Sequence, residues 1–381
     1  MAGAQTGLLA EATVYTNRDL LRQVRRNPAV RRPGRKTLPK LRGVRGVRFI
    51  AEGRNTIGLL LGDCLEVMAT LPESSVDLIL TDPPYFQVKG EAWDRQWNTA
   101  EGFVEWLGRV ADEWFRLLKP NGSLYCFASP RMAARVEVML GERFNVLNAI
   151  TWQKDAGWHN KNRPEDLRAF LSPWERIVFA EHHGADSYAK GEAGYVAKCD
   201  ELRGFLFEPL RKYLADEWEA AGLTNRDANE TTGTQMAGHW FTSSQWALPT
   251  EEMYDALRLR ANGHLRREYE DLRREYEDLR REYEDLRRPF TVTAETPYTD
   301  VWSFPTVADH PDKHPCEKPL PLLRHIVEVS TRPGATVFDS FMGTGSTGIA
   351  ARSLGRDFIG IDQSPEYVRI AEGLLAQQIL F

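Results

Sequence analysis

Short apolar runs alternate with segments of helical spacing along two stretches of the chain. The first stretch contains runs with the length of buried strands, at 58–61, 76–80, 122–128, 146–152 and 175–182. Between them, 101–118 and 131–140 carry apolar residues at helical intervals. After 335 the alternation resumes, with a strand before Asp339 and another at 358–361. This order predicts an α/β fold: an open, mostly parallel sheet with helices on both faces and ligands at the carboxyl ends of its strands.

The pattern is interrupted between 186 and 297, where polar and aromatic residues replace the apolar runs that a sheet needs. We interpret this segment as a mainly helical insert that splits the α/β domain into parts at 51–185 and 298–381. Near the end of the insert, the heptad LRREYED begins at Leu265, Leu272 and Leu279, so that the repeats cover 265–288.

The net charge of −5 over 381 residues hides an asymmetry, because residues 1–50 are strongly basic. Arg31 and Arg32 belong to this arm, which could bind DNA phosphates without reading sequence. The alternative is a solvated tail.

Composition also excludes several classes. The apolar runs are far shorter than a membrane span and the N-terminus has no apolar leader, so we expect a cytoplasmic protein without membrane contact. The four cysteines lack the spacing of a zinc site or a disulfide scaffold. His182 and His183 have no Cys or His set nearby, and we predict no metal.

The tetrapeptide Asp82-Pro83-Pro84-Tyr85 follows the strand 76–80 and therefore lies at the carboxyl edge of the sheet. An amino group on a heteroaromatic ring is a poor nucleophile, since its lone pair is delocalised. A carboxylate and a carbonyl in a stiff Pro-Pro turn can accept hydrogen bonds from that group and favour attack by its nitrogen. The ring of Tyr85 can stack on a base taken out of a duplex.

A second motif, FDSFMGTGSTG at 338–348, is a strand that breaks into a glycine-rich turn and a helix. Glycines allow close backbone approach to a ligand, and a helix N-terminus with Ser346 and Thr347 suits a carboxylate. About twenty residues later the next strand ends in Asp362, the place of the acid that binds ribose in dinucleotide folds.

The order DPPY, helical insert, HPCEKP at 314–319, FMGTGSTG and an acidic strand end resembles the beta-class amino-methyltransferases of DNA. The resemblance covers about 58–375 and implies a circularly permuted, Rossmann-like methyltransferase sheet with S-adenosyl-L-methionine as methyl donor. It implies a catalytic set of Asp82, Pro83, Pro84 and Tyr85. The implied donor site consists of Asp63, Cys64, His314, Lys318, Pro319, Asp339, Phe341, Gly343, Gly345, Ser346, Thr347 and Asp362.

Aspartate as the first residue of the tetrapeptide is typical of adenine-N6 members of this family, and serine of cytosine-N4 members. The resemblance therefore implies adenine N6 in double-stranded DNA, reached by base flipping, with cytosine N4 as the alternative. Methyltransferases of RNA or protein glutamine are more remote alternatives, because they usually lack this motif order. A DNA-binding protein without catalysis is disfavoured by the presence of both Asp82 and the glycine turn.

The insert has the layout of a helix-turn-helix. A helix at 202–221 is followed by a second start capped by Thr224, and 234–241 could form a short reading helix. That helix would present Thr234, Gln235 and His239 to base edges. The alternative is a helical pair that only packs the insert, and Gly238 argues against a long helix here.

The heptads favour self-association. Tyrosines at 269, 276 and 283 and leucines at 272, 279 and 286 share one seam, and glutamate and arginine flank it in the order that suits a parallel homodimer. The seam could instead fold onto the insert or remain exposed to solvent. A single solvated helix could also be stabilised by pairs four apart, such as Glu270 with Arg274.

Overall fold

The computed structural model describes residues 47–52, 55–87, 94–154, 164–182, 203–242, 246–293, 299–308 and 316–376. The basic arm with Arg31 and Arg32, and His314 of the HPCEKP segment, lie outside the described residues. The chain divides into two compact units, an α/β unit on both sides of the insert and a helical unit within 185–287. The described helices include none long and apolar enough to cross a membrane.

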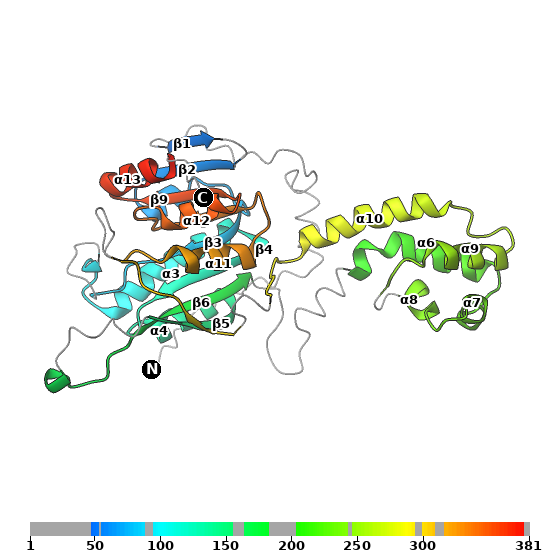
Figure 1. Cartoon of the computed structure of the whole chain (residues 1–381), viewed down its shortest axis with the longest axis horizontal. Helices are drawn as coiled ribbons and strands as arrows, with labels where there is room; N and C mark the ends of the chain where they lie inside the picture. The colour runs from blue at the N-terminus through cyan, green and yellow to red at the C-terminus, as the bar shows by residue number, and fades with distance from the viewer. Residues whose placement is uncertain are drawn as a thin grey trace, which may run out of the picture. The chain divides into compact units, whose positions relative to one another are not determined.

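The α/β unit is built on one sheet, which confirms the predicted open, mostly parallel architecture (Figure 1). Among the described residues its strand order is β1-β2-β9-β8-β3-β4-β6-β5-β7. The block from β2 to β4 is parallel throughout, whereas β1 is antiparallel to β2, and β6 is antiparallel to β4 and β5. The strands are β1 (Val47–Glu52), β2 (Asn55–Leu61), β3 (Val76–Thr81), β4 (Leu118–Ala128), β5 (Phe144–Gln153), β6 (Trp174–His182), β7 (Val301–Ser303), β8 (Thr336–Asp339) and β9 (Asp357–Asp362).

Helices cover both faces of the sheet, because successive residues of the central strands point to opposite sides. In β3, Ile79 packs under one group of helices and Leu78 and Leu80 under the other. The first group is α2 (Cys64–Met68), α3 (Ala100–Leu117) and α4 (Ala133–Gly141). The second group is α11 (Leu320–Ser330), α12 (Ser346–Ser353) and α13 (Pro365–Ala376). A short 3-10 turn, η3 (Pro164–Asp166), lies between β5 and β6.

The centre of the sheet has a topological switch point between β8 and β3. The chain leaves β8 through α12 on one face and leaves β3 through α3 on the other. In open α/β sheets the crevice outside the carboxyl ends at such a point is where ligands bind. Thr81 and Asp339, which end these neighbouring strands, are 258 positions apart in sequence and hydrogen-bonded to each other (2.9 Å).

The helical unit has a separate apolar core. Its helices are α6 (Glu208–Ala220), α7 (Asn225–Thr232), α8 (Ala237–Phe241), α9 (Glu251–Arg260) and α10 (Tyr269–Leu286). The unit ends at Arg287, ten residues before the predicted end of the insert. The difference arises because Arg288 already belongs to the α/β unit, where it pairs with the buried Glu181 of β6 (2.5 Å).

The predicted reading helix is shorter than expected. Thr224 caps α7 in a capping box, as its sequence predicts, but α8 begins only at Ala237. Thr234 and Gln235 lie in the preceding turn, where the Thr234 hydroxyl contacts that of Thr232 (2.9 Å) and accepts from the Met236 N–H (3.3 Å). These polar contacts and the left-handed Gly233 stop the helix from starting at 234.

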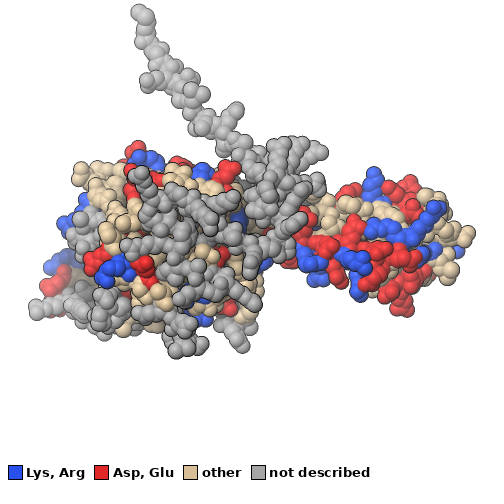
Figure 2. All heavy atoms as spheres, turned by 90° about the horizontal axis from the view of Figure 1, so that it is seen from above, with Lys and Arg blue, Asp and Glu red and all other residues tan. Residues whose placement is uncertain are grey.

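The heptad seam is occupied within the helical unit. Leu272 and Tyr283 are buried in its core, and the other tyrosines and leucines of the seam pack against that core. The structure therefore favours folding onto the insert over the predicted homodimer, because the seam residues pack on the core of their own unit, two of them buried and four partly buried. On the outer face, arginines pair with acids three positions before them, such as Arg273 with Glu270, rather than in the expected Glu270–Arg274 pair. Figure 2 shows acidic and basic side chains intermixed over this unit.

Candidate active site

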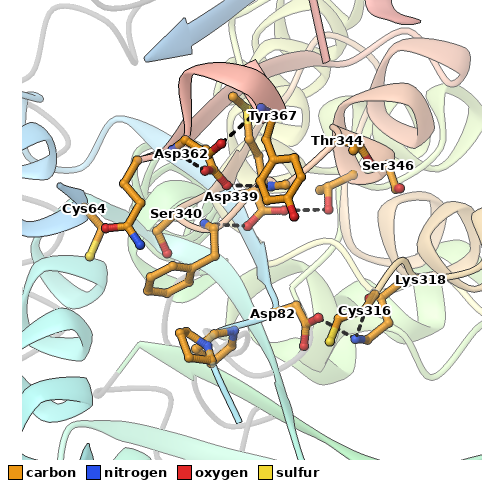
Figure 3. Close-up of a pocket in the computed structure, with 18 of the residues that line it drawn as sticks. Cys64, Asp82, Cys316, Lys318, Asp339, Ser340, Thr344, Ser346, Asp362 and Tyr367 are labelled. Carbon is orange, nitrogen blue, oxygen red and sulfur yellow. Dashed lines mark hydrogen bonds and ion pairs between the residues drawn. The ribbon is translucent and has the colours of Figure 1, made fainter. Parts of the chain in front are cut away.

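The carboxyl ends of β2, β3, β8 and β9 surround a cavity of about 150 Å³ in the α/β unit (Figure 3). Its walls come from three segments that are distant in sequence: the turns after β2 and β3, the segment 316–318, and the turns after β8 and β9. Of the predicted site residues, the lining includes Asp63, Cys64, Asp82, Pro83, Pro84, Tyr85, Lys318, Asp339, Phe341, Gly343, Ser346, Thr347 and Asp362. The structure thus brings the two predicted motifs into one site.

Asp339 shapes the glycine turn after β8. Its carboxylate is buried and accepts hydrogen bonds from the Thr81 hydroxyl (2.9 Å), the Phe341 N–H (3.0 Å) and the Thr347 hydroxyl (2.7 Å). Burial raises the pKa of Asp339 to about 6, although these donors oppose the shift. The carboxylate therefore holds β3, the turn and α12 together at the cavity wall.

Asp362 at the end of β9 fixes the same turn from the other side. It accepts hydrogen bonds from the N–H groups of Gly343 (3.0 Å) and Ser364 (2.8 Å), and burial raises its pKa to about 6. Gly345 has a left-handed backbone (φ 88°), and a Cβ there would lie 3.0 Å from the Cβ of Ala371. Only glycine suits this position, so the turn after β8 requires a glycine at 345.

The turn after β2 supplies the far wall of the cavity. Asp63 caps α2, where its carboxylate accepts from the Leu65 and Glu66 N–H groups (2.9 and 3.2 Å). The neighbouring Cys64 is buried, and burial followed by the nearby Asp63 raises the pKa of its thiol to about 12. Cys64 is therefore a neutral, apolar wall residue.

Asp82 belongs to a buried ionic cluster with Lys318, Glu175 and Lys154. It is the most exposed of the four, although only 17% of its side chain is accessible. Its Oδ2 pairs with the Nζ of Lys318, whereas Oδ1 is buried and has no hydrogen-bond partner among the described residues. Burial raises the pKa of Asp82, against the attraction of Lys318. A buried carboxylate oxygen without a donor is costly, so this oxygen is suited to an N–H group of a ligand.

Tyr85 is held at both ends. Its backbone N–H donates to Oδ1 of the buried Asp94 (2.7 Å), and its hydroxyl donates to Oε2 of Glu175 (2.7 Å). The Lys318 ammonium lies 5.1 Å from the centre of its ring. Burial, and then the carboxylates of Asp82 and Glu175, raise the pKa of Tyr85, so its hydroxyl stays a donor.

Several predicted residues take other positions. Pro319 precedes α11 and Gly345 precedes α12, and both shape the walls rather than line the cavity. Gln235 is exposed and His239 half-buried in the helical unit.

Sequence reasoning missed some lining and supporting residues. Trp106, at an apolar position of the helix predicted at 101–118, packs against the core and also lines the cavity, where it contacts Phe341 (5.8 Å between ring centres). Ser340 and Tyr367 also line it. Glu175 was passed over, although a charged residue at the start of the apolar run ERIVFAEH was a signal. No group of three candidate metal ligands occurs within the described ranges.

Comparison with known proteins gives consistent matches. The model of a family described as DNA methylase matches residues 76–373. "DNA adenine methyltransferase YhdJ" of Escherichia coli is 25% identical over 340 residues, covering 86% of this chain and 84% of that protein. "Type II methyltransferase M2.DpnII" of Streptococcus pneumoniae is 26% identical over 333 residues, covering 84% and 89%. A solved putative DNA modification methylase of Thermus thermophilus, complexed with S-adenosyl-L-methionine, is 22% identical with a TM-score of 0.44, covering 84% of this chain and 92% of its own.

Proposed function

Since the chain belongs to the DNA methylase family, we propose that it transfers a methyl group from S-adenosyl-L-methionine to adenine N6 in double-stranded DNA. The observation that carries the proposal is the unpartnered Oδ1 of Asp82, which is buried beside the turns of Asp339 and Asp362. The relative named DNA adenine methyltransferase YhdJ supports adenine over cytosine N4.

The proposed roles follow from the two halves of the cavity. The bound donor supplies an electrophilic methyl group on a sulfonium. The turn 341–347 would hold its methionine part, Asp362 its ribose and the Asp63-Cys64 turn its adenine. Asp82 Oδ1 would accept a hydrogen bond from the target amine. The amine nitrogen forms the new N–C bond while the bond between the sulfonium sulfur and the methyl carbon breaks, S-adenosylhomocysteine leaves as a neutral thioether, and the methylated nitrogen gives up one proton to solvent. The target base would stack on the face of Tyr85 opposite Lys318, which requires that the base leave the duplex.

A direct test is methyl transfer by the full chain to DNA, RNA and protein, followed by long-read sequencing of DNA from a methylation-free strain that expresses it. We expect methylated adenine in DNA at a defined sequence. Methylated cytosine would instead support the cytosine-N4 alternative. Transfer only to RNA or protein would refute the proposal.

The donor site has an expected pH dependence. The Asp362 carboxylate accepts ribose hydroxyls best when charged, and its pKa is about 6, above its ordinary value of 3.8. Donor affinity should therefore be highest above pH 6 and fall as the pH drops through 6. Asp362→Asn should weaken donor binding at pH 8 roughly tenfold, by the loss of a charge-assisted hydrogen bond, and flatten the fall. Calorimetric titration between pH 5 and 8 measures both, and an unchanged profile in the variant would contradict the ribose role.

Sequence reading by the helical unit remains a proposal. The exposed Gln235 of the α7–α8 turn, where Thr234 shapes the backbone, and the half-buried His239 of α8 could reach base edges. A base-edge hydrogen bond contributes roughly 1–3 kcal/mol of discrimination, so Gln235→Ala or His239→Ala should relax the methylated motif. Arg31→Ala with Arg32→Ala should instead weaken DNA binding for all sequences and reduce its salt dependence. If both Gln235→Ala and His239→Ala methylate the same DNA sequence as the wild type, these residues do not read the sequence, and the alternative of a helical pair that only packs the insert is supported.

A further inference from the structure

Two buried glutamates lie on the same strand, β6, and make different contacts. Glu181 pairs with Arg288 (2.5 Å) and accepts from the Asn145 amide (3.0 Å), which joins β5, β6 and the returning chain. Glu175, at the start of β6 beside the cavity, contacts Tyr85, Lys154 and Lys318. The strand thus offers one glutamate at the site and a matched one elsewhere.

Glu175 contacts three polar side chains, one of which, Lys318, pairs with Asp82. Its Oε1 accepts from Lys154 of the β5 end (2.7 Å), and its Oε2 accepts from the Tyr85 hydroxyl (2.7 Å). The same Oε2 lies 3.5 Å from the Lys318 ammonium, which also pairs with Asp82. Lys318 is only 6% exposed and Glu175 11%, so water screens these charges weakly.

The cluster contains two acidic and two basic side chains. Burial raises the pKa of Glu175, but Lys318 and Lys154 outweigh this and hold the pKa below its ordinary value. Burial lowers the pKa of Lys318, and Asp82 and Glu175 more than reverse that shift. Two carboxylates therefore face two ammonium groups, and Lys318 is shared between Asp82 and Glu175.

We propose that Glu175 is a positioning residue for methyl transfer: it holds Lys318 and the Tyr85 hydroxyl so that one oxygen of Asp82 stays available to the target amine. The inference rests on the proposed function. Lys318 binds Oδ2 of Asp82 and orients the carboxylate, while Glu175 draws the ammonium away from Oδ1. The bond to the Tyr85 hydroxyl fixes the ring on which the base would stack.

Removal of the Glu175 charge should disturb this arrangement. In Glu175→Gln, Lys318 loses its second carboxylate and pairs with Asp82 alone, so the amine competes with an ammonium for Oδ1. Tyr85 loses a charged acceptor, and such bonds are stronger than neutral ones. Because an error of about 1 Å at a reacting group costs up to roughly a hundredfold, we expect kcat to fall between tenfold and a hundredfold. Donor affinity and the KM for DNA should change little.

The experiment compares the full chain with Glu175→Gln, Glu175→Asp, Tyr85→Phe and the Glu175→Gln/Tyr85→Phe pair. For each, kcat and KM are measured with a methylatable duplex and donor affinity by calorimetry. If Glu175 acts through Tyr85, the two single losses in kcat are not additive. Glu175→Asp keeps the charge and should recover part of kcat. Glu181→Gln is the matched control, which should lower stability while kcat of the folded protein stays near wild type.

Three outcomes would overturn the inference: wild-type kcat in Glu175→Gln, fully additive losses with Tyr85→Phe, or an equal loss of kcat in Glu181→Gln. If Glu175→Gln does not fold, the cycle is carried out with Glu175→Asp, whose shorter side chain places its carboxylate farther from Lys318 and should still lower kcat. A wild-type chain that binds the donor but methylates no DNA would refute the proposed function instead. An active wild-type protein with an equally active Glu175→Gln variant would refute only the role of Glu175.

Discussion

Replacement of Asp82 by alanine should remove methyl transfer while leaving the donor bound. Asp82 Oδ1 is the buried acceptor without a partner, and no other described carboxylate lining the cavity has an unpartnered buried oxygen. Asp339 and Asp362, which shape the proposed donor site, make their hydrogen bonds independently of Asp82. Loss of one preorganised group that stabilises a transition state costs roughly a hundredfold to a thousandfold in kcat, and we expect at least this.

The control for Asp82→Ala is Asp82→Asn. The alanine variant leaves the buried Lys318 with Glu175 alone, which could destabilise the site, whereas asparagine keeps the shape and a carbonyl acceptor. Both should bind the donor with near wild-type affinity in calorimetry, and both should lose activity, asparagine less completely. Substantial turnover by Asp82→Ala, or loss of donor affinity in a folded variant, would contradict the assignment of Asp82 to the target amine.

The turns after β8 and β9 could be predicted from the sequence because their constraints are local. Gly345 is required by a left-handed backbone at a close approach to α13, and Asp362 ends a strand that its apolar run reveals. Such features depend on a few neighbouring residues, and so they can be seen in a single sequence. The place of Asp82 followed in the same way, from the end of the preceding strand.

The contacts around Asp82 could not be predicted, because they depend on which strands become neighbours. Glu175 reaches Tyr85 only because β6 pairs with β4 on the far side from β3. The antiparallel insertion of β6 into the sheet brings its first residues, rather than its last, to the catalytic edge. Trp106 packs against the core, as its helical spacing predicts, but that spacing does not reveal the cavity that the same face borders.

The heptads show a different limit. Their repeat correctly predicted one apolar seam on a helix, but a repeat does not specify the partner of the seam. In the structure the tyrosines find partners inside the helical unit. Tyr276 packs on Phe207 (5.3 Å between ring centres), and the Tyr269 hydroxyl donates to the Pro249 carbonyl (3.0 Å). These contacts explain how bulky tyrosines are accommodated at positions where a dimeric coiled coil would be strained.

Leu272→Ala should destabilise the helical unit much more than Leu279→Ala. Both leucines occupy the same heptad position, but Leu272 is fully buried whereas Leu279 is half-buried. A buried leucine replaced by alanine costs about 2–5 kcal/mol, through lost burial and the cavity left behind. A half-buried one should cost about 1 kcal/mol. In a homodimer that used the seam, the two positions would be equivalent and the two costs similar, so the comparison separates the two arrangements.

Hydrogen exchange of the full chain measures the effect where it occurs. Peptides from 203–242 and 246–287 should lose protection in Leu272→Ala, while peptides from the sheet keep theirs, because the two units have separate cores. Sedimentation should find the intact chain monomeric. Deletion of 265–285 is a poor test, since it removes α10 from the core of its own unit and would unfold that unit whether or not a dimer exists. Equal costs at Leu272 and Leu279 together with a dimer in sedimentation would restore the self-association that the heptads alone predict.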